Sequence, residues 1–69
     1  MAKPVRFPEI TVTGSDLAGL EPYRAMSEVT AQMWTAGVDP ADMENYCAEI
    51  EGLSSVELVE RSRDWVTVV

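Results

Sequence analysis

The sequence predicts a mostly α-helical domain in which one short N-terminal β-strand is followed by three short helices. Two observations support this fold class: β-branched residues alternate with polar ones near the N-terminus, and apolar residues then recur at spacings of three and four. The chain has 69 residues, which is enough for one domain with a thin core. We therefore treat residues 1–69 as a single small acidic domain whose residues 1–6 form a flexible N-terminal arm.

The segment Phe7–Gly14, FPEITVTG, is predicted to be the strand. Ile10 and Val12 would face the core, and the alternating polar residues Glu9, Thr11 and Thr13 would face solvent. Gly14 ends the run, and GSDLAGLE is expected to be a loop.

The first helix is predicted from Pro22 to Ala36, with Gly37 as its C-terminal cap. Its apolar residues lie three and four apart and form one stripe: Met26, Val29, Met33 and Ala36.

The second helix has clear start signals in Asp39 as N-cap and Pro40 at the first helical position, and Gly52 is expected to end it. Val38 and Met43 are placed to form a hydrophobic staple. Its apolar face combines Met43, Tyr46, Cys47 and Ile50.

The third helix begins with a capping box of Ser54 and Glu57. Leu58, Ser62, Trp65 and Val69 would share one face if the helix ran to the C-terminus. The ending Trp65–Val69, WVTVV, has strand composition, so the alternative is a helix that stops early and releases a short C-terminal strand.

The predicted core combines the inner faces of these helices. The residues expected to be mostly buried are Met26, Val29, Met33, Met43, Tyr46, Cys47, Ile50, Leu58 and Trp65.

Composition excludes several classes of function. Five basic residues against twelve acidic ones give a net charge of −7, so nucleic acid is an improbable partner because its binding requires basic groups that displace counterions. One cysteine cannot form an intramolecular disulfide, which favours a reducing compartment. No secretory signal and no apolar run long enough for a membrane span are apparent, so we expect a cytoplasmic protein.

Four landmarks occur in order along the chain: FPEITV near the start, Ala36-Gly37-Val38 at a helix break, the pair Ala48-Glu49, and the closing Asp64-Trp65-Val66. Together they resemble a group of small uncharacterised proteins from actinobacteria, other bacteria and their phages. Members of that group typically read FPEVTV, then AG(V), then AEA near a GDY turn, then RWV. The similarity covers roughly residues 7–66. It implies a shared fold and a phage or mobile-element setting, and it brings no activity with it.

The sequence departs from that group at three places. Leu53-Ser54-Ser55 stands where the others have Gly-Asp-Tyr, and Asp64 stands where they have arginine. The first helix of the group is rich in arginine, whereas this chain has Glu28, Thr30, Ala31 and Trp34 at those places.

Catalytic, metal and cofactor sites are not predicted. The chain has no histidine that could activate Cys47, and the position of this cysteine on an apolar face is typical of a small buried residue. Asp39, Asp42 and Glu44 do not have the spacing of a calcium loop, and zinc would require histidine or several cysteines. We expect a protein that is not an enzyme and that uses no cofactor.

The remaining candidates lie on the surface. In the second helix Asp42 and Glu49 are seven residues apart, and so are Glu44 and Glu51. The two members of each couple therefore lie on the same side of the helix, two turns apart. These acids form either a solvated face or a patch for a basic partner.

Two aromatic residues form the other surface candidate. Tyr23 and Trp34 are eleven residues apart, which places them on one side of the first helix, either at the core edge or as anchors of an interface. The candidate partner-binding residues are therefore Tyr23, Trp34, Asp42, Glu44, Glu49 and Glu51.

The function that these observations favour is a non-enzymatic, protein-binding factor of phage or mobile-element origin. The second reading is an acidic inhibitor that mimics nucleic-acid charge toward a host defence or DNA-handling protein. The third is a small DNA-binding dimer of the ribbon-helix-helix kind, with the strand paired to its copy. Independently of function, the strand needs a partner, which is either Val66–Val69 of the same chain or the strand of a second copy, and we expect the homodimer.

Overall fold

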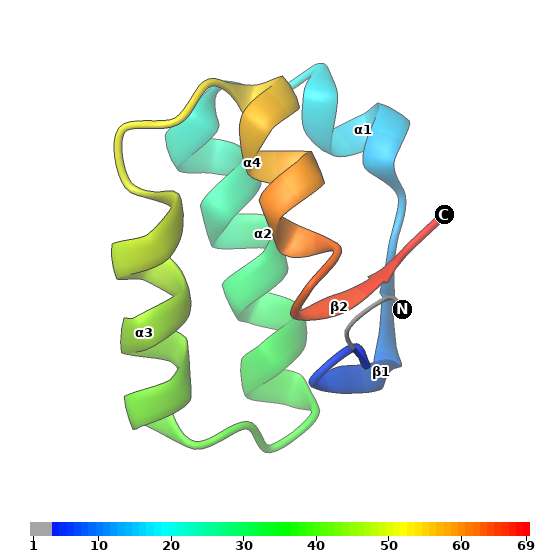
Figure 1. The fold of residues 1–69 in the computed structure, drawn as a ribbon, viewed down its shortest axis with the longest axis vertical. Helices are drawn as coiled ribbons and strands as arrows, with labels where there is room; N and C mark the ends of the chain where they lie inside the picture. Colours follow the sequence, from blue (N-terminus) through cyan, green and yellow to red (C-terminus); the bar gives the residue numbers. More distant parts are fainter. Residues whose placement is uncertain (1–3) are drawn as a thin grey trace.

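The computed structural model describes residues 4–69 and confirms the mostly α-helical class (Figure 1). Four helices lie between two short strands. The elements are β1 Phe7–Val12, α1 Gly14–Ala18, α2 Pro22–Thr35, α3 Pro40–Ile50, α4 Ser55–Ser62 and β2 Val66–Val68. Helices α2 and α3 lie side by side, α4 packs on α2, and the two strands lie at the edge of the molecule away from α3.

Helix α1 is the element that the sequence prediction missed, because residues 14–18 were expected to be loop. The backbone turns directly after β1, and the N–H of Leu17 donates to the carbonyl of Thr13 at 3.1 Å. Leu17 is buried in the core, whereas its neighbours on both sides are exposed. The helix forms because α1 packs against α4, which is distant in the sequence. With five residues and one buried leucine, α1 is too short to show a periodic apolar pattern.

Gly14 lies where the end of β1 meets the C-terminal segment. An added Cβ would lie 2.9 Å from Cγ1 of Val68 and 3.3 Å from Cγ1 of Val59. Both neighbours are β-branched side chains with little rotational freedom. The position therefore requires glycine for reasons of space.

We expect Gly14→Ala to lower the free energy of unfolding by about 1–3 kcal/mol, because the added methyl group overpacks this contact. Urea denaturation measures the change. Gly19→Ala is the matched control, since its Cβ would meet atoms no closer than 3.6 Å and should leave stability nearly unchanged or slightly raised. Equal midpoints for the two variants would contradict the close approach at Gly14.

The predicted boundaries of α2 and α3 agree closely with the structure, because both depend on local caps. The carboxylate of Asp39 accepts from the N–H of Ala41 at 2.8 Å, as expected of an N-cap. Gly37 and Gly52, which follow the two helices, both have φ of +82°, a conformation that glycine adopts without steric cost. The first helix is one residue shorter than predicted, since it ends at Thr35 with Ala36 as its cap.

At the C-terminus the structure adopts the second of the two predicted alternatives: α4 ends at Ser62 and a strand follows. The hydroxyl of Ser54 caps α4 by accepting from the N–H of Glu57 at 3.3 Å. Strand β2 then pairs in parallel with β1, and the pairing matches Phe7 with Val66 and Val12 with Val68, with an irregularity between Phe7 and Thr11. The β-branched ending fits this pairing better than it fits a helix.

The partner of β1 is therefore β2 of the same chain, whereas we had expected the strand of a second copy. The N–H of Phe7 donates to the carbonyl of Trp65 at 2.8 Å, and the N–H of Val69 donates to the carbonyl of Val12 at 2.9 Å. This pairing uses one edge of β1, and dimer formation stays a prediction. Glu9, Thr11 and Thr13 are exposed, as predicted.

The predicted N-terminal arm, residues 1–6, lies partly outside the described residues. Of its described part, Arg6 is attached to the fold. Its N–H donates to the carbonyl of Asp64 at 3.2 Å, and its guanidinium carbon lies 4.4 Å from the centre of the Trp65 ring.

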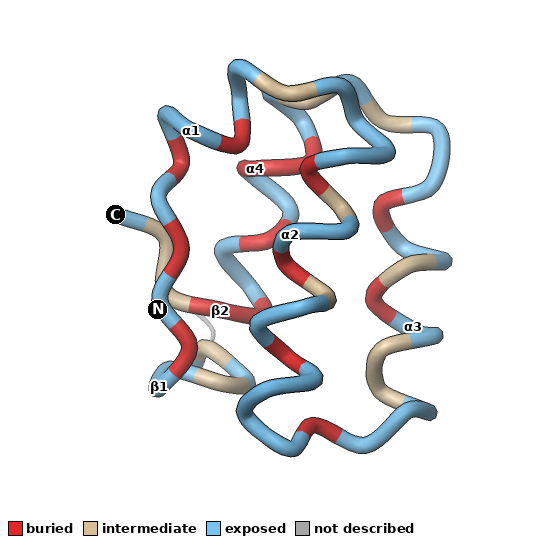
Figure 2. The backbone as a smooth tube through the Cα atoms, turned by 180° about the vertical axis from the view of Figure 1, so that it is seen from behind, coloured by how far each residue is buried: buried red, intermediate tan, exposed pale blue. Residues whose placement is uncertain are grey.

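Six of the nine residues predicted to form the core are buried: Val29, Met33, Tyr46, Ile50, Leu58 and Trp65. The other three, Met26, Met43 and Cys47, are only half-buried and pack against the core from one side. Figure 2 shows buried and exposed positions alternating along α2, as expected of a helix with one inner face. The helix phases were therefore predicted correctly, and the three exceptions lie on a single surface described below.

Tyr46 and Ser62 form the polar contact inside this core. Their hydroxyl oxygens are 2.6 Å apart, and the Ser62 hydroxyl also donates to the carbonyl of Leu58 at 2.7 Å. Both side chains are fully buried, and burial raises the pKa of Tyr46 to about 12 in spite of the hydrogen bond to Ser62, which lowers it.

We expect the fold to lose stability above pH 10 through Tyr46. Between the ordinary tyrosine pKa of 10.0 and the folded value of about 12, the unfolded chain releases this proton while the folded chain keeps it. Rising pH therefore favours unfolding, by about 1.4 kcal/mol per pH unit in that window. The measurement is urea denaturation at several pH values from about 8 to about 11.5, a range that brackets the ordinary tyrosine pKa. The parent and Tyr23→Phe should show this slope of unfolding free energy against pH, and Tyr46→Phe should show a shallower one. Identical slopes in all three proteins would contradict the assignment.

Candidate protein-binding groove between two helices

One side of α2 carries large side chains that the core does not cover. Tyr23, Met26, Thr30 and Trp34 follow one another at spacings of three, four and four residues, so they share a side of the helix. Tyr23 is 75% exposed and Trp34 is 67% exposed. The interpretation of these two aromatics as core-edge residues is wrong, because both rings lie largely in solvent.

Helix α3 completes this surface with Met43 and Cys47, which lie four residues apart and are half-buried. Burial, with a smaller contribution from the Glu44 carboxylate, raises the pKa of the Cys47 thiol. The thiol is therefore held in its neutral form and adds an apolar, polarisable atom to the surface.

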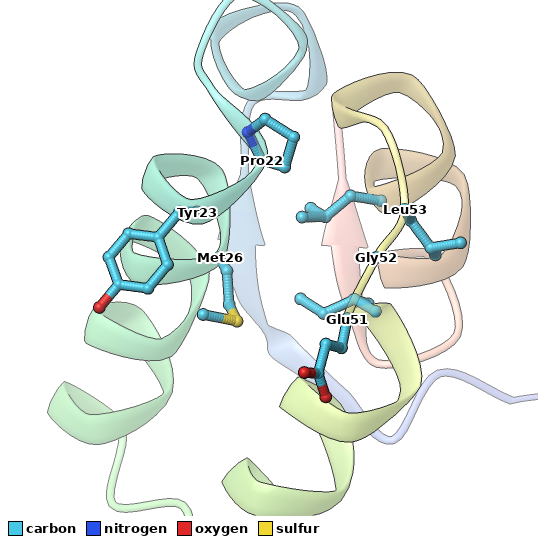
Figure 3. Close-up of a pocket in the computed structure, with 8 residues that line it drawn as sticks. Pro22, Tyr23, Met26, Glu51, Gly52 and Leu53 are labelled. Atoms are coloured by element: carbon cyan, nitrogen blue, oxygen red, sulfur yellow. The ribbon is translucent and has the colours of Figure 1, made fainter.

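Two hollows lie between α2 and α3, one near each end of the helix pair. The larger has a volume of about 390 Å³ and lies where α2 begins and α3 ends (Figure 3). Met26 faces Glu51 and Leu53 across this hollow, and the Tyr23 ring lies at its rim on the outer side of α2. Its lining residues are Pro22, Tyr23, Met26, Ile50, Glu51, Gly52, Leu53 and Leu58.

The smaller hollow has a volume of about 300 Å³ and lies where α2 ends and α3 begins. Its lining residues are Thr30, Trp34, Pro40, Met43, Glu44 and Cys47. We refer to the two hollows together as the α2–α3 groove. Both are lined mainly by apolar side chains, and their volumes lie in the lower part of the range of small-molecule and side-chain binding pockets.

The four acidic candidates fall on two sides of α3. Glu44 lines the smaller hollow and Glu51 lines the larger one. Asp42 and Glu49 lie on the opposite side of the helix, because a step of two residues turns a helix by about 200°. The structure therefore brings four of the six candidates, Tyr23, Trp34, Glu44 and Glu51, to the groove.

Glu49 has a structural role on its side of α3. Its Oε2 accepts from Nε1 of Trp65 at 3.2 Å, and its Oε1 lies 3.7 Å from Nη1 of Arg61. These contacts join α3 to α4 and to Trp65 at the start of the C-terminal strand. Asp42, in the first turn of α3, is half-buried and adds negative charge at the positive end of the helix dipole.

Sequence reasoning assigned Met26, Met43 and Cys47 to the core and so did not include them in the candidate site. Their periodicity shows which helix face they occupy but does not show how far a neighbouring helix covers that face. The usable signal was the alignment of Tyr23 with Trp34, since Met26 and Thr30 lie between them on the same side of α2.

Residues 4–69 hold no group of three or more His, Cys, Asp and Glu side chains that could bind a metal ion. None of the helices within this range combines the length and the apolar character needed to cross a membrane.

No protein-family model matches the chain, and no curated protein or solved structure is significantly similar to it.

Proposed function

We propose that this protein is a non-enzymatic protein-binding factor that contacts its partner through the α2–α3 groove. The observation that carries the proposal is the exposure of Tyr23 and Trp34 beside two apolar hollows. The few residues that dominate the binding energy of protein interfaces are enriched in tryptophan and tyrosine, and an exposed apolar patch on a protein surface marks an interaction site.

Two further features support a protein as the partner. Met26 and Met43 are flexible side chains that can adapt their shape to a contacting surface. The groove is shallow and lies along two helices, so it suits an extended contact with another polypeptide. The phage or mobile-element origin is part of the proposal and is supported by the resemblance carried by FPEITV and the closing Asp64-Trp65-Val66.

The experiment is affinity capture from a lysate of the organism that encodes the protein, with quantification of every captured protein. We expect one or a few proteins to be retained by the parent and reduced about 30-fold or more by Trp34→Ala, as for an interface residue that contributes about 2 kcal/mol. Val56→Ala is the control, because Val56 is also exposed (64%) but lies on α4 outside the groove. Capture that is unaffected by both Trp34→Ala and Tyr23→Ala would overturn the proposal.

A second candidate function is charge mimicry directed at a nucleic-acid-binding protein. It is favoured by the small number of ion pairs: of the twelve acidic residues, only Glu49 and Glu60 pair with a basic side chain within residues 4–69. In this case the captured partner would bind DNA, and the protein would compete with DNA for it. Competition that persists in Trp34→Ala and weakens steeply with salt would favour mimicry over binding through the groove.

A further inference from the structure

We infer that the α2–α3 groove accepts a basic amphipathic helix of the partner, with an apolar side chain in each hollow and Lys or Arg beside Glu44 and Glu51. This inference rests on the proposed function and specifies the chemistry of the partner segment. Three features of the groove support it: its shape, the side chains at its base and the charge at its edge.

The shape of the groove fits a helix. Tyr23 and Trp34, at the two ends, are eleven residues apart on α2, which corresponds to about 16 Å along the helix axis. A docked helix spans that distance in about three turns, and its residues at positions i, i+7 and i+11 lie on one side. Two apolar side chains on that side would therefore reach the two hollows, as in other helix-in-groove complexes.

The base of the groove suits side chains that are long and apolar. Met26 lies in the larger hollow and Met43 in the smaller one, so each hollow contains a flexible thioether. Methionine-rich surfaces repack around different apolar side chains, which allows the anchor in each hollow to be leucine, methionine or an aromatic residue.

The charge at the edge of the groove selects a basic partner. Glu44 and Glu51 are exposed, lie seven residues apart on one side of α3, and form no ion pair with Arg6, Arg24, Arg61 or Arg63. Among the described residues 4–69, no lysine or arginine lines either hollow. Two basic residues that are likewise two turns apart on a docked helix would meet these carboxylates.

The same charge disfavours a second copy of this chain as the occupant. Two copies joined through the groove would bring Glu44 and Glu51 of both chains toward one seam, and each copy carries a net charge of −7. Like charges placed together at an interface oppose association, so the groove is better matched to a basic segment of another protein.

The test uses three synthetic peptides of about 18 residues, which is enough for five helical turns. The first combines a leucine stripe with lysines, the second replaces every lysine by glutamate, and the third has the residues of the first in scrambled order. Titrations are followed by NMR through the methyl groups of Met26 and Met43 and the indole N–H of Trp34. We expect the first peptide to shift these signals, and the second and third to bind at least about tenfold more weakly.

The matched protein variants carry equal changes in net charge. The double variant Glu44→Gln, Glu51→Gln should bind the first peptide about tenfold more weakly than the parent does. The control double variant is Glu9→Gln, Glu28→Gln, whose positions are exposed and lie outside the groove, and its affinity for the peptide should change little. Equal losses in the two double variants, or equal binding of the lysine and glutamate peptides, would overturn the inference. The oligomeric state gives a further test at about 10–50 μM, roughly the range of weak self-association. A parent that is dimeric there while Trp34→Ala is monomeric would also overturn the inference, because a second copy would then occupy the groove.

The two proposals fail in different ways. If capture from the lysate depends on Trp34 but no preference for the basic helix is found, the protein-binding function stands and the chemistry inferred for the partner is wrong. If capture depends on neither Trp34 nor Tyr23, the function itself is wrong.

Discussion

Trp65→Ala is expected to lower the free energy of unfolding by about 3–5 kcal/mol, the range for removal of a buried aromatic side chain. Trp65 is 3% exposed, directly precedes β2, and contacts both Phe7 of β1 and Tyr46 of α3. Its ring stacks on Phe7 with centroids 6.5 Å apart and meets the Tyr46 ring edge-on at 5.6 Å. The substitution would remove both aromatic contacts and leave a cavity among three elements.

The polar contacts of Trp65 increase this cost. Its Nε1 donates to Glu49, and Arg6 lies over its ring, so the substitution also removes the partner of a carboxylate and of a cation. A domain of this size has roughly 3–10 kcal/mol of stability, at about 0.05–0.15 kcal/mol per residue. We therefore expect Trp65→Ala to be largely unfolded under conditions where the parent is folded.

Urea denaturation followed by circular dichroism measures this effect. Trp34→Ala is the control, because the same substitution at a side chain that is 67% exposed should change the free energy of unfolding by less than about 0.5 kcal/mol. A parent-like midpoint for Trp65→Ala, or equal losses in the two tryptophan variants, would contradict the packing described for the C-terminal segment.

The helices whose boundaries were predicted from sequence are those that carry their own signals. Asp39 and Ser54 cap α3 and α4 with side-chain hydrogen bonds, and Gly37 and Gly52 follow α2 and α3 with positive φ. Such interactions lie within a few residues of the chain, so the sequence contains them.

The elements that sequence reasoning missed or left open depend on distant contacts. Helix α1 forms around Leu17, whose burial depends on α4 some forty residues later. The choice between helix and strand after Ser62 depends on β1, which lies more than fifty residues earlier in the chain and supplies the pairing for Val66–Val68. Neither contact can be derived from local propensity.

The candidate site was predicted in part for the same reason. The alignment of Tyr23 with Trp34 follows from helical periodicity, but their exposure depends on how far α3 extends over α2. Glu49 looked equivalent to Glu44 and Glu51 in the sequence. In the fold, Trp65 and Arg61 engage Glu49, whereas the other two carboxylates line the groove.

Ile50→Ala is the second substitution with a large expected effect, about 2–5 kcal/mol of unfolding free energy. Ile50 is buried at the last turn of α3 and lies with Leu58 beneath the larger hollow of the groove. Removing three carbons there would leave apolar atoms on both sides without contacts, and the hollow above would deepen.

A graded series tests whether this loss comes from packing. Ile50→Val, which removes one methylene, should cost about 0.5–1.5 kcal/mol, and Val56→Ala on the exposed side of α4 should cost less than about 0.5 kcal/mol. The urea midpoint should be highest for Val56→Ala, lower for Ile50→Val and lowest for Ile50→Ala. The slope of the unfolding free energy against urea concentration should be the same in all three. An Ile50→Ala midpoint equal to that of Val56→Ala would show that α3 does not present Ile50 to the core. Trp34→Ala should show the opposite behaviour, because this side chain lies in solvent beside the groove: it should weaken binding of the partner and leave stability nearly unchanged.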